Sequence, residues 1–187
     1  MKKSILLLFL ICVEVASAQN LSSIQLNTLD QKKISLDAIK KNTASVFVFL
    51  SPDCPLCRSY VPVLDSLQKK FSSDSIGFYG VFPGTLYSDE EILNFFVSQR
   101  LEMPYFVDDG MVMTSFLKAT VTPEVFIVDR NGMVEYGGRI DDRVVELGKK
   151  KTLINSHELA DALLAICSGK KITISKTEAT GCLIEKK

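Results

Sequence analysis

The chain has 187 residues, of which 47% are hydrophobic and 24% are charged, and its 22 basic residues balance its 22 acidic ones. This length suits one globular domain around a single core. A net charge of zero argues against a nucleic-acid-binding protein, because such proteins carry an excess of Lys and Arg. The ordinary hydrophobic and charged fractions argue against intrinsic disorder. The chemistry must therefore come from local motifs.

The first 18 residues have the layout of a cleavable secretory signal peptide. Met1-Lys2-Lys3 is a positive n-region, residues 5–13 form an apolar run, and Ala16-Ser17-Ala18 is a small-x-small cleavage site. The run is shorter than the roughly 20 apolar residues that span a bilayer, so an uncleaved N-terminal anchor is the weaker alternative. Cleavage would leave residues 19–187 as a single domain with a net charge of −1. We expect that domain to be periplasmic or secreted, with no stable membrane insertion.

The first half of the mature chain alternates between predicted strands and helices. Residues 21–41 alternate apolar and polar side chains around a polar turn, which predicts a hairpin followed by a turn of helix. The continuous β-branched and aromatic run over 45–50 predicts a strand buried on both faces. Apolar residues then recur every three or four positions up to residue 71, which predicts an amphipathic helix. A second buried strand is predicted over 76–82.

The second half continues this alternation and ends in a hairpin and a helix. Ser88 and Glu91 form a capping box that predicts a helix start, and a short strand and a short helix are predicted over 104–107 and 111–119. Asn131-Gly132 predicts the turn of a hairpin. A last helix is predicted over 155–168, capped by Asn155.

This order of elements implies an α/β fold with helices on both faces of a central mixed sheet. From about residue 170 the chain is polar and is interpreted as a C-terminal tail. Lys149-Lys150-Lys151 is interpreted as a solvated loop, and the charges between Arg139 and Arg143 as a solvated or salt-bridged loop.

Cys54-Pro55-Leu56-Cys57 lies where the strand at 45–50 passes into the first long helix. Two intervening residues place both sulfurs on the first helical turn, where unpaired N–H groups and the helix dipole stabilise a thiolate. We predict that Cys54 is the exposed, more acidic thiol that attacks a disulfide. Cys57, one turn further on, would be buried and would resolve the mixed disulfide.

Neighbouring residues are expected to support this chemistry. Pro55 suits the first helical turn, where a missing N–H has no cost, and Leu56 completes the spacing. Arg58 would lower a thiol pKa through its charge, whereas Asp53 would raise it. No cofactor is expected beyond the redox-active Cys54-Cys57 disulfide itself.

A zinc half-site and a purely structural disulfide are the alternatives for this motif. The remaining candidate zinc ligands, His157, Cys167 and Cys182, form no second pair at ligand spacing, so no metal is predicted. A structural disulfide across so small a loop gains little closure entropy.

Two prolines add to the pattern. Pro62 lies inside the predicted helix, where proline ordinarily costs about 3 kcal/mol, and suggests a kinked active-site helix. Thr122-Pro123 precedes the strand at 124–129, and a proline at the first residue of a strand can be cis. An ordinary trans proline at a sheet edge is the alternative.

Taken together, the strand, the CxxC, Pro62 and Thr122-Pro123 resemble the thioredoxin fold. The N-terminal hairpin and the extra helix resemble its redoxin branch, which comprises TlpA-like and AhpC/TSA-like extracytoplasmic proteins. The segments that carry the resemblance are residues 51–57, 81–84, 122–126, 138–143 and 181–184.

The resemblance implies a thioredoxin-like three-layer α/β/α sandwich with an N-terminal β-hairpin extension. It also implies a thiol–disulfide oxidoreductase that acts on protein thiols and disulfides with an unidentified redox partner. Thr122 and Pro123 would face the CxxC and help to hold an extended substrate peptide. The sequence departs from thioredoxins in carrying Asp53 in place of their Trp and Val48 in place of their buried acid.

A thiol peroxidase and a copper chaperone are the competing functions. A peroxiredoxin normally has a Pro-x-x-x-Thr/Ser-x-x-Cys pattern; Ser51 fits it, but Phe47 stands at the proline position. An Sco-like chaperone pairs a CxxxC with a histidine in the facing loop. Here the spacing is CxxC, and His157 is predicted at the start of the last helix.

Two cysteines remain outside the CxxC. Cys167 shares a predicted helical face with Leu159, Leu163 and Ile166 and is expected to pack as a small hydrophobic residue. Cys182 could pair with Cys167, stay free or reach the CxxC as a third redox thiol.

Overall fold

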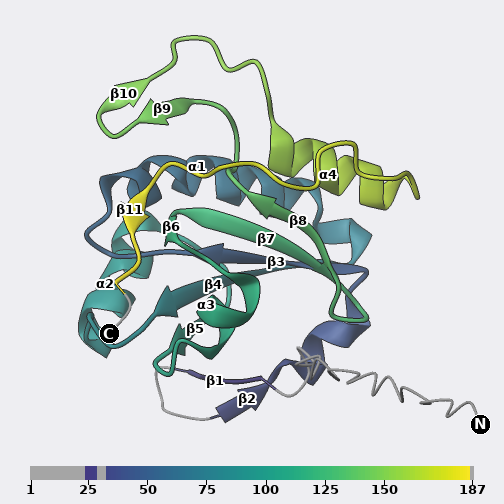
Figure 1. Ribbon diagram of the computed structural model, residues 1–187. Coiled ribbons are helices and arrows are strands. Elements are labelled where there is room, and N and C mark those ends of the chain that lie inside the picture. The colour runs from purple at the N-terminus through teal and green to yellow at the C-terminus, as the bar shows by residue number, and fades with distance from the viewer. Residues whose placement is uncertain (1–23, 29–32, 186–187) are drawn as a thin grey trace, which may run out of the picture.

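The computed structural model describes residues 24–28 and 33–185, in which strands and helices alternate (Figure 1). The signal peptide predicted over residues 1–18 lies outside the described residues. The strands are β1 (Gln25–Asn27), β2 (Lys33–Ser35), β3 (Ala44–Phe49), β4 (Ile76–Pro83), β5 (Tyr105–Asp108), β6 (Val121–Thr122), β7 (Glu124–Asp129), β8 (Val134–Gly138), β9 (Val144–Glu146), β10 (Lys149–Lys150) and β11 (Cys182–Leu183). The helices are α1 (Pro55–Lys70), α2 (Asp89–Gln99), α3 (Val112–Leu117) and α4 (Glu158–Cys167), with 3₁₀ helices η2 (Leu36–Lys41) and η3 (Ser72–Asp74).

Seven strands form a mixed central sheet in the order β2-β1-β5-β4-β3-β7-β8. The central strand β3 is parallel to β4 and antiparallel to β7, and β4 is parallel to β5. Both predicted hairpins are confirmed: β1 pairs antiparallel with β2, and β7 pairs antiparallel with β8 across the Asn131-Gly132 turn. The N-terminal hairpin extends the sheet by adding β1 to the edge of β5.

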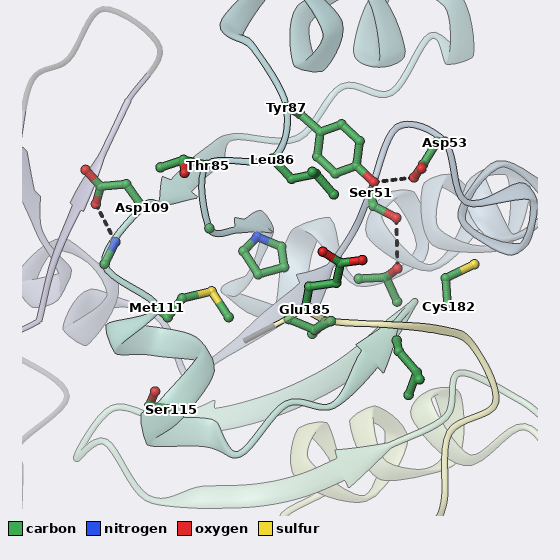
Figure 2. A pocket seen from close by; sticks show the side chains of 16 residues that line it. Ser51, Asp53, Thr85, Leu86, Tyr87, Asp109, Met111, Ser115, Cys182 and Glu185 are labelled. Carbon is green, nitrogen blue, oxygen red and sulfur yellow. Dashed lines mark hydrogen bonds between the residues drawn. The ribbon is translucent and has the colours of Figure 1, made fainter. Parts of the chain in front are cut away.

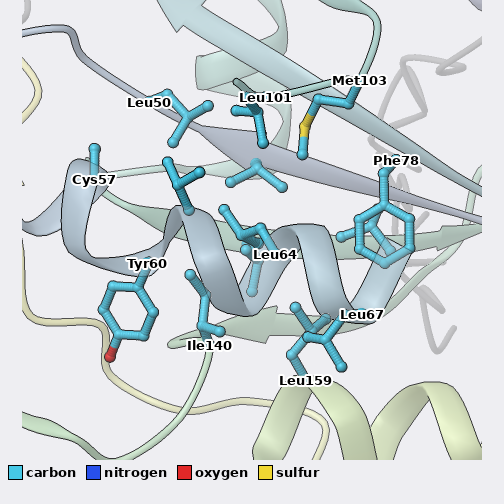
Figure 3. Close-up of a cluster of buried hydrophobic side chains, with 14 of the residues drawn as sticks. Leu50, Cys57, Tyr60, Leu64, Leu67, Phe78, Leu101, Met103, Ile140 and Leu159 are labelled. Carbon is cyan, nitrogen blue, oxygen red and sulfur yellow. The ribbon is translucent and has the colours of Figure 1, made fainter. Parts of the chain in front are cut away.

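Helices cover both faces of this sheet because its central strands are apolar on both sides. In β3, Val46 and Val48 belong to the hydrophobic cluster under α1, α2 and α4, whereas Phe47 and Phe49 belong to the cluster under η2 and α3. Figure 3 shows Leu64 of α1 in the middle of the first cluster. The predicted three-layer α/β/α sandwich is therefore confirmed.

Helix α1 contains Pro62, as predicted from the sequence. Proline cannot donate the N–H that the carbonyl of Arg58 would otherwise receive. Pro62 lies on the exposed side of the helix, where water can satisfy that carbonyl. The capping box of α2 is also present: the Ser88 hydroxyl accepts from the Glu91 N–H, and the Glu91 carboxylate accepts from the Ser88 N–H.

Two boundaries differ from the prediction. Helix α4 begins at Glu158 with His157 as its N-cap residue, so Asn155 does not cap it. The Asn155 N–H instead donates to the Asp142 carboxylate at 3.0 Å and ties this connection to the preceding loop. The lysine-rich segment is not a plain loop, because Lys149 and Lys150 form β10, which pairs with β9.

The loop after β8 is salt-bridged, in agreement with the sequence interpretation. Arg139 pairs with Glu158 of α4, and Arg143 pairs with Asp141 at 2.7 Å. The Asp141 carboxylate also accepts from the Tyr60 hydroxyl of α1 at 2.9 Å. These contacts hold the loop against both helices.

The C-terminal segment is not a free tail. The backbone of Thr177 and Ser175 bonds to Gly137 of β8, each at 3.0 Å, and the chain then returns to the CxxC end of the sheet as β11 (Figure 1, yellow). There Cys182 pairs with Thr122 and Leu183 pairs with Val121. None of the helices in the described part of the chain has the length and hydrophobicity needed to cross a membrane.

Candidate functional site

The two cysteines of the CxxC lie at the junction between β3 and α1. Cys54 is the N-cap residue of α1, with extended backbone dihedrals and no hydrogen bond from its side chain to the first helical turn. Pro55 is the first helical residue, and Leu56 and Cys57 present their backbone N–H groups towards the Cys54 sulfur. The sequence thus places this sulfur at the positive end of the helix dipole.

The loop between β6 and β7 lies against the CxxC. The peptide bond between Thr122 and Pro123 is cis. The Cys54 thiol donates to the Thr122 carbonyl at 3.1 Å, and the Thr122 hydroxyl is 2.9 Å from the hydroxyl of Ser51, just before the CxxC. The two loops are therefore linked by side-chain and backbone hydrogen bonds.

The environment of Cys54 lowers the pKa of its thiol to about 5. The largest cause is a hydrogen bond from the Cys57 thiol, which stabilises the thiolate. Burial opposes ionisation, but a further hydrogen bond from Cys182 and the N–H groups of Cys57 and Leu56 outweigh it. Cys54 is therefore the thiol that ionises first.

Cys57 has the opposite character. Its side chain has no exposed surface, and burial raises the pKa of its thiol well above the usual range, with the hydrogen bond to Cys54 and the Cys54 charge adding to the shift. The Ser51 N–H donates to the Cys57 sulfur at 3.5 Å. This buried thiol is suited to a second, resolving step.

Cys54 is not exposed, which corrects the sequence prediction. Only 1% of its surface is accessible, because β11 brings Cys182 over it. The Cys182 thiol donates to the Cys54 sulfur across 2.7 Å, so of the three alternatives for Cys182 the structure realises contact with the CxxC. The four cysteines within the described residues all carry free thiols.

Cys167 was also predicted wrongly. It lies at the end of α4 and is exposed rather than packed as a small hydrophobic residue. The buried apolar residues of the helix are Leu159, Ala162 and Leu163 in its first two turns, whereas Cys167 is its last residue and lies beyond this contact. Pairing of Cys167 with Cys182 is not realised either, since Cys182 contacts Cys54.

A pocket of about 590 Å³ opens beside Cys182, which contacts Cys54 (Figure 2). The segment after β4, the start of α3 and the C-terminal strand enclose it, and Ser51, Thr122 and Cys182 lie on its wall. Its charged lining is acidic: Asp53, Asp109 and Glu185. Among the described residues that line it there is no lysine or arginine.

The sequence match to known families agrees with this geometry. Residues 18–137, well over half of the chain, match the AhpC/TSA family. The chain belongs to the AhpC/TSA family. No curated protein matches this AhpC/TSA-family chain.

Solved structures share the fold of this AhpC/TSA-family protein. A hypothetical protein from Sinorhizobium meliloti is 20% identical, with a TM-score of 0.76 over 88% of this chain and 91% of its own. A secreted Mycobacterium tuberculosis disulfide oxidoreductase homologous to E. coli DsbE is 16% identical, with a TM-score of 0.56 over 76% and 95% of the two chains. The M. tuberculosis protein DsbF is 20% identical, with a TM-score of 0.59 over 78% and 96%. At these identities the similarity establishes the thioredoxin-like fold.

Three residues next to the two cysteines, Asp53, Leu56 and Arg58, each make a different contact. In the AhpC/TSA-family protein the Arg58 guanidinium donates to the Pro52 carbonyl at 2.7 Å, which braces the turn before the CxxC. Asp53 accepts a hydrogen bond from the Tyr87 hydroxyl, and its charge helps to raise the pKa of Cys182. Leu56 is buried under the first turn.

Two positioning residues were missed by the sequence analysis. Ser51 links the CxxC loop to Thr122, and the buried Glu124 accepts from the Thr120 N–H at 2.7 Å and so holds the chain before Pro123. Their signal was weak but present. Ser51 follows the apolar run of β3 directly, and Glu124 is an acid at the first residue of a predicted strand, where a charged group that becomes buried needs partners.

The described residues contain no group of three His, Cys, Asp or Glu side chains arranged to hold a metal ion. His157 lies at the start of α4, as predicted, and is its N-cap residue in place of Asn155. The loop that faces the CxxC is occupied by Thr122 and Pro123 instead.

Proposed function

We propose that this protein is an extracytoplasmic thiol–disulfide oxidoreductase in which Cys54 attacks and Cys57 resolves. The observation that carries the proposal is the unequal pair of thiols at the N-terminus of α1. The pKa of Cys54 is lowered to about 5, whereas the pKa of the fully buried Cys57 is raised. Only the thiolate is nucleophilic, so this difference assigns the order of the two steps.

Each step exchanges one sulfur–sulfur bond for another. The Cys54 thiolate attacks one sulfur of a substrate disulfide, that bond breaks, and the leaving thiolate takes a proton from water. Cys57 then gives up its proton and attacks Cys54, which releases the second substrate thiol. The substrate gains two electrons and the Cys54-Cys57 pair loses them. The reverse sequence oxidises a substrate dithiol, and neither direction needs a cofactor beyond the cysteines.

Protein thiols and disulfides are the proposed substrates, with a separate redox partner that restores the Cys54-Cys57 pair. The edge of β6 supports this choice, since it pairs with the extended segment Cys182–Leu183 through Thr122 and Val121. An extended substrate peptide would take the same edge beside Pro123 by displacing β11, which occupies that edge in the structure. Two solved structures of this fold are of a secreted disulfide oxidoreductase and of DsbF in mixed oxidised and reduced forms. The signal-peptide layout of residues 1–18 supports a periplasmic or secreted location.

Mixed-disulfide trapping tests the proposal. The double variant Cys57→Ala/Cys182→Ala keeps only the attacking thiol at the site, and we expect it to accumulate a reducible covalent adduct with insulin. The matched variant Cys54→Ala/Cys182→Ala should form none at Cys57, and peptide mapping separates any adduct on the exposed Cys167, which both variants share. Equal adduct formation by both variants would overturn the proposed order. Consumption of hydrogen peroxide by the wild type at a rate above its rate with insulin would favour the peroxidase instead.

A further inference from the structure

Three sulfurs meet at the site, one more than the proposed reaction uses. The Cys182 sulfur lies 2.7 Å from the Cys54 sulfur, and Cys182 lines the pocket beside the site. Cys54 itself is 1% exposed. Cys182 is thus the thiol that stands between Cys54 and the pocket.

Several contacts along the C-terminal segment hold Cys182 in this position. The Thr177 hydroxyl accepts from the Arg139 N–H at 3.0 Å, and beyond β11 the Ile184 N–H donates to the Thr120 carbonyl at 2.9 Å. Gly181 makes the close approach possible: a Cβ at this position would lie 2.4 Å from the Thr122 carbonyl oxygen. Any larger residue must push β11 away from β6.

We propose that Cys182 is a third redox-active residue, a second resolving thiol that forms a disulfide with Cys54 in competition with Cys57. The inference rests on the proposed function and extends it to a residue outside the CxxC. It also gives the C-terminal segment a part in the reaction rather than a purely structural role.

The step balances as follows. After Cys54 has formed a mixed disulfide with a substrate sulfur, the Cys182 thiol gives up its proton and its thiolate attacks the Cys54 sulfur. The bond from Cys54 to the substrate breaks, and the substrate sulfur leaves with the electron pair and takes up a proton. The products are a reduced substrate thiol and a Cys54-Cys182 disulfide, with Cys57 still a thiol. Attack by Cys57 on Cys54 would convert this form into the Cys54-Cys57 disulfide and regenerate the Cys182 thiol.

The mixed disulfide favours Cys182 electrostatically as well. In the reduced protein, the pKa of Cys182 is raised to about 12. The causes are burial, the hydrogen bond to Cys54 and the Cys54 charge. The last two causes vanish once Cys54 is bonded to a substrate sulfur, so Cys182 then ionises more easily. The same two causes also raise the pKa of Cys57, and burial is the largest cause for both thiols. Cys57 has no exposed surface in the reduced protein whereas Cys182 is partly exposed, so burial opposes the ionisation of Cys57 more strongly.

The test compares full-length variants treated with cystamine, a small cationic disulfide. In Cys57→Ala we expect the cysteamine adduct on Cys54 to be transient and to give a Cys54-Cys182 disulfide, identified by peptide mapping. In Cys57→Ala/Cys182→Ala the adduct should persist. Cys57→Ala/Cys167→Ala is the matched control, since it lacks an exposed distant thiol, and should behave like Cys57→Ala. An adduct that persists equally with and without Cys182 would overturn the proposal.

A second variant separates the position of Cys182 from its presence. Cys57→Ala/Gly181→Val keeps all the sulfurs of Cys57→Ala but moves β11, and we expect resolution to slow by at least tenfold. An unchanged rate would contradict the inference.

A diamide arm distinguishes failure of the inference from failure of the proposed function. Diamide oxidises neighbouring thiols without a substrate disulfide. If cystamine forms no adduct on Cys54 in any variant, the proposed attack by Cys54 is wrong. The diamide result on Cys57→Ala then decides the inference: a Cys54-Cys182 disulfide supports it and its absence overturns it.

Discussion

The acidity of Cys54 depends on hydrogen bonds that single substitutions can remove. The Cys57 thiol supplies the largest stabilisation of the thiolate and Cys182 a smaller one. We expect Cys57→Ala to raise the pKa of Cys54 more than Cys182→Ala does, because a lost donor leaves the thiolate less stabilised. The pH dependence of iodoacetamide modification at Cys54 measures both shifts. Cys57→Ser, which keeps a donor, is the control, and a pKa still near 5 in Cys57→Ala would refute this explanation.

The same low pKa couples stability to pH. Between about pH 5 and pH 8 Cys54 is ionised in the folded reduced protein and protonated in the unfolded chain, so the unfolded state binds more protons. The free energy of unfolding of the wild type should therefore rise with pH relative to that of Cys54→Ala. This difference should disappear as the pH falls through about 5. Above about pH 8.5 the raised pKa values of Cys57 and Cys182 act in the opposite direction. Urea denaturation of both reduced proteins across this range measures the difference, and a constant difference would contradict the assignment.

The bond between Ser51 and Thr122 is also open to a direct test. Both side chains are buried, so Thr122→Val removes one of the hydrogen-bond partners of the Ser51 hydroxyl and should cost about 1–3 kcal/mol. In the double variant Ser51→Ala/Thr122→Val no hydroxyl is stranded, and part of this loss should return. Urea denaturation of the wild type, Ser51→Ala, Thr122→Val and the double variant gives the coupling energy. Additive losses would mean that the two hydroxyls do not stabilise each other.

At the scale of elements, local patterns predicted what is decided locally. The apolar run of β3, the capping box at Ser88 and the Asn131-Gly132 turn each depend on neighbouring residues, and all three were confirmed. The position of Cys182 could not be predicted in this way. Cys182 contacts Cys54, which lies 128 positions earlier in the chain. The strand that brings it there has only two residues and lies in a polar segment with no clear periodicity. The exposure of Cys54 was misjudged for the same reason, since the strand that covers it comes from the far end of the chain.

The C-terminal segment is held on β8 by a glycine whose replacement should release it. Gly138 has a φ of +141°, and a Cβ there would lie 2.3 Å from the Thr177 carbonyl oxygen. Gly148 has a φ of +83° but has nothing near its missing Cβ, so Gly148→Ala reports backbone strain alone. We expect Gly138→Ala to cost at least about 1 kcal/mol more than Gly148→Ala, and only Gly138→Ala to speed alkylation of Cys182. Denaturation and peptide mapping measure the two effects. Equal costs and equal alkylation rates would show that this contact does not hold the segment.

At the scale of the whole molecule, charge should select among substrates, although the chain as a whole is neutral. Asp53, Asp109 and Glu185 give the pocket a negative field beside the sulfurs, and opposite charges attract through such a field until salt screens them. We expect the wild type to react faster with cationic cystamine than with anionic oxidised glutathione. The ratio of these two rates should be larger for the wild type than for free cysteine, the reference thiol. The preference should shrink as the ionic strength rises from about 0.01 M to about 1 M, where the screening length falls from about 30 Å to about 3 Å. Glu185→Gln should reduce it at low salt, whereas Glu178→Gln, outside the pocket lining, should not. A preference that salt and Glu185→Gln leave unchanged would mean that the shape of the pocket, and not its charge, chooses the disulfide.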